Sequence, residues 1–233
     1  MNYSKLTATF LTILFAVSFA AAQETVRQPF IRTVGEAVVN VAPDRAEIDI
    51  GVVTEASTSQ AAVSQNAQKV EATLARLRSL LGAQADIKTV SYNVSPVYRY
   101  PQNAEPQITG YSATNIVRVT LDDLTKIGSV IDSATLAGAN RIQQLQFSLK
   151  DEQPVQARAL REAALKARQK ADALASALGL TSVRIFSVEE SSAPVIPLRK
   201  DYAMRAEAAS VTPIETGTIE VRASVTLTVQ ISQ

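Results

Sequence analysis

The chain has 233 residues, 46% of them hydrophobic, and a formal net charge of +1. Such a balanced chain has no long-range field to attract nucleic acid or an anionic membrane, which disfavours a nucleic-acid-binding function. The sequence contains no cysteine and no histidine, and this excludes disulfides, thiolate chemistry, histidine general bases and most zinc sites.

The first residues have the three-part pattern of a secretory signal peptide. Lys5 is the only charge before an apolar run over residues 6–19, and Ala20-Ala21-Ala22 then offers small residues to signal peptidase. The apolar run is short for a membrane span, which argues against the alternative of an uncleaved anchor. We expect residues 1–22 to be removed, residues 23–233 to be exported, and no later segment to span a membrane. The exported chain has equal numbers of acidic and basic residues.

Strands are predicted where apolar and polar residues alternate. Residues 31–41 form the first strand, and Pro43-Asp44 is predicted to turn the chain into its partner strand, which begins at Ala46. Half-buried strands are also predicted around residues 117–121 and 145–149. The last strand, residues 219–231, alternates most regularly, as expected for an antiparallel sheet that is covered on one face.

Helices are predicted where apolar residues recur every three or four positions. They cover residues 56–81, about 122–136 and 155–178, and Asp122 or Asp123 is expected at the positive end of the second helix. The inward stripe of the first helix is predicted to be Val63, Ala67, Val70, Leu74, Leu77 and Leu81. That of the third helix is predicted to be Leu160, Ala164, Ala167, Ala171, Leu174 and Leu178.

The predicted element order is β-β-α-β-β-α-β-α-β-β. Strand pairs interspersed with helices indicate an α+β fold, with helices packed on one face of a largely antiparallel sheet. Residues 191–211 form the longest predicted irregular segment, and a connection of that length is typical of functional or mobile loops.

Few side chains remain for catalysis. No Ser-x-x-Lys, phosphate-binding glycine loop or calcium-loop spacing of acids occurs. The pairs Asp122-Asp123 and Glu189-Glu190 are acidic, but aspartates at a helix start act as caps, and neighbouring strand residues face opposite sides. A carboxylate-based glycosidase needs two acids facing across a cleft, and no spacing points to such a pair. We therefore predict no enzyme activity, no catalytic or cofactor-binding residue and no metal site.

The best candidate site is a group of aromatic residues on two consecutive strands joined by a loop at residues 101–107. It consists of Tyr92, Tyr98, Arg99, Tyr100 and Tyr111. Tyr and Arg are enriched at interface anchors, and tyrosine rings also stack on ring-shaped ligands. Cross-strand packing between hairpin partners is nevertheless the favoured explanation of the group. An interface is favoured over a ligand site among the functional options.

Several short motifs occur in an order that is typical of one protein family. In chain order they are Val34-Gly35-Glu36-Ala37, Pro43-Asp44, Tyr111-x-Ala113-Thr114-Asn115, Gly138-Ala139-Asn140 and Thr212-Pro213-Ile214. Residues 23–233 thereby resemble the SIMPL-domain family, which includes bacterial periplasmic immunogenic proteins formerly described as outer-membrane proteins. The resemblance implies a fold of two interleaved α/β subdomains, whose boundary the sequence does not define.

The resemblance also implies a function. A related periplasmic protein forms a large ring-like homo-oligomer with a channel-like cavity, and family members are linked to envelope and oxidative stress. We therefore expect an exported, periplasmic, non-enzymatic protein that self-assembles into a homo-oligomer, with a ring- or channel-like arrangement as an extension of that hypothesis. A monomeric periplasmic module that binds a small molecule or a partner protein is the alternative. Peripheral association with the outer membrane stays open.

Overall fold

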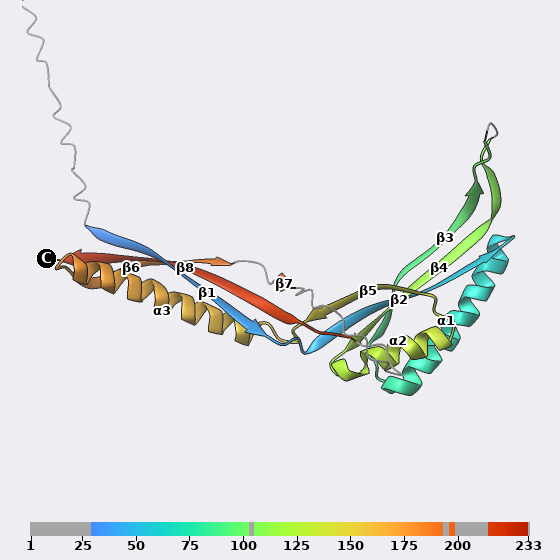
Figure 1. Cartoon of the computed structure of the whole chain (residues 1–233), viewed down its shortest axis with the longest axis horizontal. Coiled ribbons are helices and arrows are strands. Elements are labelled where there is room, and N and C mark those ends of the chain that lie inside the picture. The colour runs from blue at the N-terminus through green and yellow to red at the C-terminus, as the bar shows by residue number, and fades with distance from the viewer. Residues whose placement is uncertain (1–28, 103–104, 193–195, 199–213, 233) are drawn as a thin grey trace, which may run out of the picture.

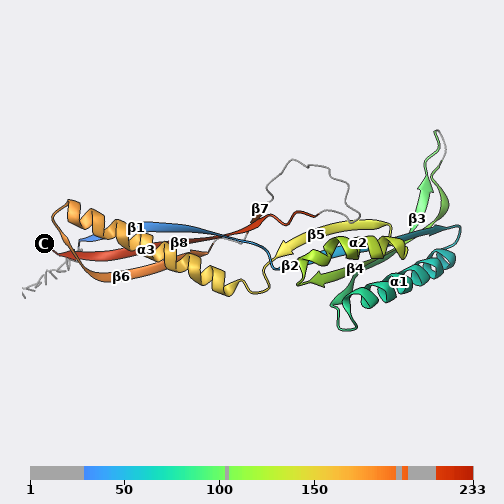
Figure 2. The same cartoon turned by 60° about the horizontal axis from the view of Figure 1, so that its bottom comes forward.

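The computed structural model describes residues 29–102, 105–192, 196–198 and 214–232. The predicted signal peptide lies outside the described residues, as do residues 193–195 and 199–211 of the predicted irregular segment. The described chain is an elongated α+β molecule with two antiparallel sheets, and each sheet has helices against one face (Figures 1 and 2). The predicted element order is confirmed, with one short strand, β7, added.

The first sheet, sheet A, is built from the two ends of the described chain. β1 (Phe30–Val41) pairs along its whole length with β8 (Thr218–Ser232). On its other side β8 pairs with β6 (Thr181–Ser192) and with the short β7 (Ile196–Leu198). The helix α3 (Gln153–Ala177) lies along this sheet and packs mainly on β1 and β8.

The second sheet, sheet B, is built from the middle of the chain. Its strands, in spatial order, are β3 (Ile87–Arg99), β4 (Gln107–Leu121), β2 (Arg45–Ala56) and β5 (Arg141–Ser148). Two helices cover one face, namely α1 (Ser59–Leu81) and α2 (Ile127–Leu136), with the 3-10 turn η1 (Leu124–Lys126) leading into α2. Among the described residues, no helix is long and apolar enough to cross a membrane.

The predicted pairing of residues 31–41 with the strand that begins at Ala46 is wrong. β1 pairs with β8, whereas β2 lies between β4 and β5, so both edges of β2 are already occupied. Pro43-Asp44 is therefore a link between the two sheets and not a hairpin turn. Sequence proximity favours local pairing, and the true partner of β1 lies at the opposite end of the chain.

A row of alanines brings α3 close to sheet A. The buried residues of α3 are Ala159, Ala163, Ala167, Ala171 and Ala175, one every four positions. Gly35 lies beneath this row, and a Cβ placed there would be 2.0 Å from the Ala163 carbonyl oxygen and 2.4 Å from the Ala167 nitrogen. Thr33 Oγ1 also donates a hydrogen bond of 2.7 Å to the Ala167 carbonyl oxygen. The backbones of helix and strand are thus in near contact.

The predicted stripe of α3 is only partly right. Ala167 and Ala171 are buried as predicted, but Leu174 and Leu178 are 48% and 66% exposed. A leucine side chain does not fit where the helix backbone lies directly on the strand, so the inward positions are limited to alanine. The buried stripe is consequently rotated away from the leucines.

The core of sheet B is built from larger side chains. Ile48 and Ile50 of β2 are fully buried beneath α1 and α2. The predicted inward stripe of α1 is confirmed at Val70 and Leu77, but Ala67 is exposed. Two polar residues, Asn66 and Thr73, are fully buried on that helix. Thr73 Oγ1 donates to the Lys69 carbonyl oxygen of its own helix at 2.8 Å, so its burial needs no outside partner.

The substitution Gly35→Ala should strongly destabilise sheet A. Its methyl group would overlap backbone atoms of α3, which cannot move aside as a flexible side chain can. We expect the free energy of unfolding to fall by about 3 kcal/mol, the upper end for overpacked sites, measured by urea unfolding. Val34→Ala, at the adjacent exposed position, is the control and should cost less than about 1 kcal/mol. Equal losses in the two variants would contradict the close-contact model.

Candidate functional site

The predicted tyrosine group lies on the β3–β4 hairpin, but the structure spreads it along the length of the hairpin. Tyr92 is opposite Asn115, and Tyr111 is opposite Pro96. A bulge between Val97 and Tyr98 then places Tyr98 opposite Ile108. The extra residue of this bulge, Thr109, belongs to β4, so the alternation along β3 is not interrupted between Tyr92 and Tyr98. Tyr92, Tyr98 and Tyr111 therefore share the helix side of sheet B, and they differ in how far along the hairpin they lie.

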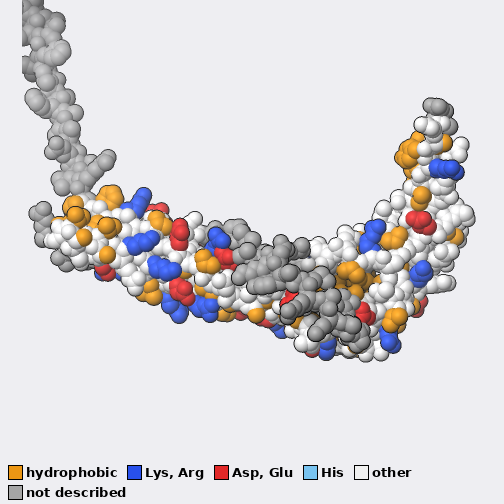
Figure 3. All heavy atoms as spheres, in the orientation of Figure 1, with side chains coloured by type: hydrophobic (Ala, Val, Ile, Leu, Met, Phe, Trp, Pro, Cys, Tyr) orange, Lys and Arg blue, Asp and Glu red, His pale blue; other side chains and the backbone are white. Residues whose placement is uncertain are grey.

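The end of this hairpin extends beyond the rest of sheet B. β4 pairs with β2 only from Tyr111 onward, so residues 97–100 and 107–110, here called the hairpin tip, lie beyond β2 (Figure 1). Tyr98, Tyr100 and Ile108 are 45%, 75% and 52% exposed, and hydrophobic side chains are visible near the end of the hairpin (Figure 3). The rings of Tyr98 and Tyr100 have centroids 6.3 Å apart. Arg99, between them, is exposed and opposite Gln107. The tip is thus an exposed aromatic cluster beside a cation.

Tyr92 and Tyr111 line two separate hollows. Tyr92 contributes to a cavity of about 430 Å³ between α1 and the strands β3 and β4. Tyr111 lines a smaller one of about 200 Å³, together with Val97 and Gly110. The five predicted residues therefore do not form one cluster: the structure brings Tyr98, Arg99 and Tyr100 together and places Tyr92 and Tyr111 elsewhere.

The larger cavity contains two amides that the sequence reasoning missed. Asn66 is fully buried, and its Nδ2 donates to the Val52 and Ala113 carbonyl oxygens at 2.8 and 3.0 Å. Within the described ranges, the buried Oδ1 atoms of Asn66 and Asn115 have no hydrogen-bond partner. The available signal for Asn66 was its position, since it is a polar residue one position before Ala67, inside an otherwise apolar helix face. Asn115 ends the motif Tyr111-x-Ala113-Thr114-Asn115, but its neighbours alternate as in any strand, so the motif did not indicate a buried amide oxygen.

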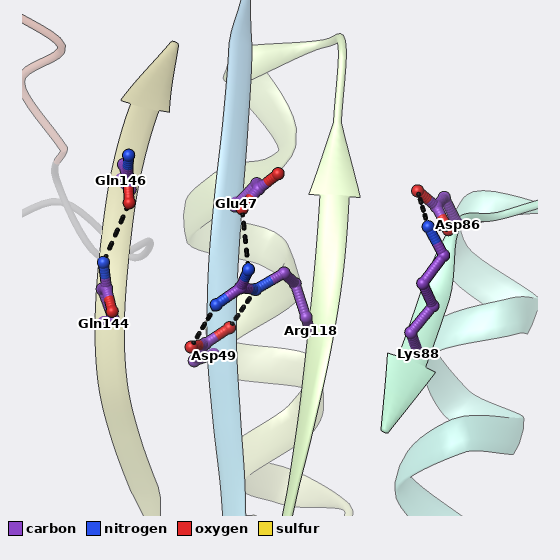
Figure 4. Close-up of polar contacts among 7 residues, drawn as sticks. All are labelled: Glu47, Asp49, Asp86, Lys88, Arg118, Gln144 and Gln146. Carbon is purple, nitrogen blue, oxygen red and sulfur yellow. Dashed lines mark hydrogen bonds and ion pairs between the residues drawn. The ribbon is translucent and has the colours of Figure 1, made fainter. Parts of the chain in front are cut away.

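Charged side chains occupy the face of sheet B that points away from the helices. Gln144, Asp49, Arg118 and Lys88 stand at paired positions across the four strands (Figure 4). Arg118 donates to both carboxylate oxygens of Asp49 at 2.7 and 2.9 Å, and its Nη1 lies 3.2 Å from Glu47. The hydrogen bonds to Asp49 raise the pKa of Arg118. We interpret this balanced row as support for the sheet and not as a reactive site.

A second polar cluster ties together the two links between the sheets. Asp44, on the link between β1 and β2, accepts a hydrogen bond of 2.7 Å from the backbone nitrogen of Lys150, on the link between β5 and α3. Asp122, at the end of β4, accepts from Arg45 Nε at 2.9 Å and from Lys150 Nζ at 2.7 Å. These bonds lower the pKa of Asp122 to about 2, and the bond to Asp122 raises that of Arg45. The cluster fixes the place where the chain crosses between sheets.

The predicted acidic pairs have separate roles. Asp123 caps η1, since its Oδ1 accepts from the Thr125 nitrogen at 3.2 Å, whereas Asp122 pairs with cations and does not cap. Glu189 and Glu190 lie opposite Thr226 and Val225, on opposite faces of sheet A. In the part of the chain that the structure describes, no group of three or more His, Cys, Asp or Glu side chains is arranged to hold a metal ion.

Together these features define a two-sheet α+β protein with a projecting aromatic hairpin and a cavity beside its first helix. The SIMPL family model, described as a protein of unknown function (DUF541), matches residues 31–229. The chain belongs to this family, as the order of its motifs indicates.

Three relatives match most of the chain. The 26 kDa periplasmic immunogenic protein of Brucella melitensis is 29% identical over 203 residues, which cover 83% of this chain and 81% of that protein. The uncharacterized protein YggE of Escherichia coli K12 is 30% identical over 208 residues, or 88% and 84% of the two chains. YggE of Edwardsiella ictaluri is 29% identical over 188 residues, or 79% of each.

The ion pairs of Asp122 should make stability depend on pH in the acid range. The pKa of its carboxyl is lowered from 3.8 to about 2, so its contribution is complete above pH 3.8 and is lost as the pH falls through 2. The difference in Tm between the native protein and Asp122→Asn, followed by circular dichroism, should therefore be constant near neutral pH and disappear toward pH 2.

Asp123→Asn is the matched control for this measurement. The pKa of Asp123 is lowered chiefly by hydrogen bonds with Thr125, so added salt should reduce the effect of Asp122→Asn more than that of Asp123→Asn. A difference for Asp122→Asn that persists unchanged below pH 2 would show that its ion pairs do not stabilise the fold.

Proposed function

We propose that this protein is an exported periplasmic protein that performs no catalysis and self-assembles into a homo-oligomer through the hairpin tip. The observation that carries the proposal is the two-stranded tip with Tyr98, Tyr100 and Ile108 exposed. A two-stranded ribbon is only marginally stable by itself, and a contact with a second copy would order it. Exposed aromatic residues beside an arginine have the composition of interface anchors.

The edges of sheet A support this choice of surface. At the outer edge of β1, Lys170 Nζ donates a hydrogen bond of 2.7 Å to the Val34 carbonyl oxygen, so this backbone group is already occupied. β6, at the other edge, has register shifts between Ser182 and Arg184 and between Ile185 and Ser187. Edge lysines and bulges both hinder the addition of a strand from another chain. Assembly by strand addition to sheet A is therefore disfavoured relative to a contact at the tip.

The symmetry of the contact determines the kind of assembly. A tip that binds the tip of a second copy gives a closed two-fold dimer, whereas a tip that binds a different surface gives a ring or a filament. The ring- or channel-like arrangement, and a role in tolerance of envelope or oxidative stress, are extensions of the proposal. Their support is the family resemblance alone.

The tip makes self-assembly testable by light scattering after size exclusion of residues 23–233. We expect a mass that is a multiple of the monomer mass. Replacing both tip tyrosines (Tyr98→Ser with Tyr100→Ser) should weaken association at least about a hundredfold, because anchors of this kind commonly contribute 2 kcal/mol or more each. Tyr92→Ser, on the same strand but within sheet B and away from the tip, is the matched control and should assemble normally.

A native chain that stays monomeric over a wide concentration range would overturn the proposed assembly. That result would favour the alternative of a monomeric periplasmic module that binds a small molecule or a partner protein. A double variant that assembles like the native chain would instead rule out the tip as the interface.

Export is supported by the signal-like pattern of residues 1–22 and by the name of the Brucella relative, which is called periplasmic. Signal peptidase should cut after Ala22, so the protein recovered from the envelope should begin at Gln23. Mass analysis of its N-terminal peptide checks this expectation. A recovered chain that retains Lys5 would indicate the uncleaved anchor.

A further inference from the structure

We propose that the hairpin tip of one copy binds the uncovered end of sheet A in a second copy, so that the contact joins two unlike surfaces. The inference rests on the proposed self-assembly through the tip, and it names the surface that receives the tip. That surface, here called the apolar end, consists of Leu178, Ile185, Phe186 and Val188, which are 66%, 50%, 77% and 59% exposed. Hydrophobic side chains are visible at this end of the molecule (Figure 3).

The residues of the apolar end surround one part of the core of sheet A. Leu178 lies in the short link between α3 and β6. Ile185 and Val188 are paired with Val229 and Leu227 of β8. Both of these partners are buried in one core cluster with the alanine row of α3. The apolar end therefore continues this core to the surface.

The close packing of α3 explains why this surface is uncovered. Backbone contact at Gly35 holds the helix on β1 and β8, so β6 stays at the margin of the helix. Single exposed apolar residues are common on protein surfaces, but a group of large ones marks an interaction site. The apolar end is thus a surface that a partner is expected to cover.

The position of the apolar end indicates that it meets the tip between two copies. The tip and the apolar end lie at opposite ends of the elongated molecule (Figures 1 and 2), so the tip of one chain cannot reach the apolar end of the same chain. The register shifts of β6 hinder strand addition, so a partner has to bind here through side chains. The tip offers such side chains, since Tyr98, Tyr100 and Ile108 are exposed beyond β2.

The charges beside the two surfaces are complementary. Arg184 and Glu189 flank the apolar residues of β6, and both are exposed. Glu189 is loosely held, because its carboxylate lies 3.9 Å from Arg32 and its side chain is 63% exposed. The tip carries Arg99, and the adjoining loop carries Glu105, which is also exposed. In one orientation Arg99 therefore meets Glu189 while Glu105 meets Arg184, and like charges are kept apart.

A contact between unlike surfaces can be tested by complementation. Every pair of copies joined in this way retains one unused tip and one unused apolar end. A variant with an altered tip still has an intact apolar end, and a variant with an altered apolar end still has an intact tip. Neither variant can associate with itself, but each supplies what the other lacks.

The test uses two variants of residues 23–233, measured by light scattering after size exclusion. The tip variant carries Tyr98→Ser with Tyr100→Ser, and the end variant carries Leu178→Ser with Phe186→Ser. Each alone should associate at least about a hundredfold more weakly than the native chain, because each lacks one half of the contact. An equimolar mixture should form a complex of one tip variant and one end variant. It should stop at two copies, since its remaining tip and its remaining apolar end are both altered.

Leu136→Ser with Leu165→Ser is the matched control. These leucines are 83% and 56% exposed, but they lie on α2 and in the middle of α3, outside both surfaces. The control should assemble as the native chain does. Circular dichroism confirms that each variant is folded, and recovery of association in the mixture confirms it independently.

Three outcomes would overturn the proposal. These are an end variant that assembles like the native chain, a mixture that stays monomeric, and a control that is as weak as the end variant. The first would show that the tip binds another surface, such as the tip of a second copy, and would leave the proposed function intact. A tip variant that assembles normally would instead overturn the proposed function itself, so the two failures are distinguishable.

Discussion

The antiparallel pairing of β1 with β8 is the constraint on which the rest of the structure depends. It joins the two ends of the described chain along the full length of β1. Sheet A can therefore be completed only when β8, near the end of the chain, is present. The middle of the chain, from β2 to β5, must therefore form its own sheet and its own core. The polar bonds of Asp44 and Asp122 with Lys150 hold the links where the chain leaves and re-enters sheet A.

Both sheets are wider than the helices that cover them. α3 lies on β1 and β8 because Gly35 and the alanine row allow near contact there, and Val188 on β6 stays exposed. In sheet B, α1 packs on β2 and β4, and β3 is left partly uncovered. The cavity beside α1 and the bare hairpin tip thus have one cause: α1 and α2 do not fully cover β3, and the β3–β4 hairpin continues beyond β2.

The sequence was sufficient to predict the helices and strands. It was insufficient to predict the partner of β1 and the buried face of α3. Periodicity predicted the strands, the helices and the α+β class, because alternation and a 3.6-residue period are local properties. The pairing of β1 depended on a strand near the opposite end of the chain, and local pairing was the wrong default. The stripe of α3 was misjudged because leucines were placed on the inward face beside the alanines, whereas backbone contact at Gly35 leaves room only for alanine. For the candidate site, the sequence predicted which tyrosines share a hairpin but not where β2 stops pairing with that hairpin, which decides which of them are in the tip.

The length of the β3–β4 hairpin, and not its bulge, separates the tyrosines of β3. The extra residue of the bulge, Thr109, belongs to β4, so the even spacing of Tyr92 and Tyr98 keeps both side chains on one side of β3. Tyr92 is opposite Asn115, inside sheet B, and lines the cavity beside α1. Tyr98 lies past Tyr111, the last residue of β4 that has a partner on β2. The point at which β2 ends thus separates the tyrosine that lines the cavity from the tyrosines of the exposed tip.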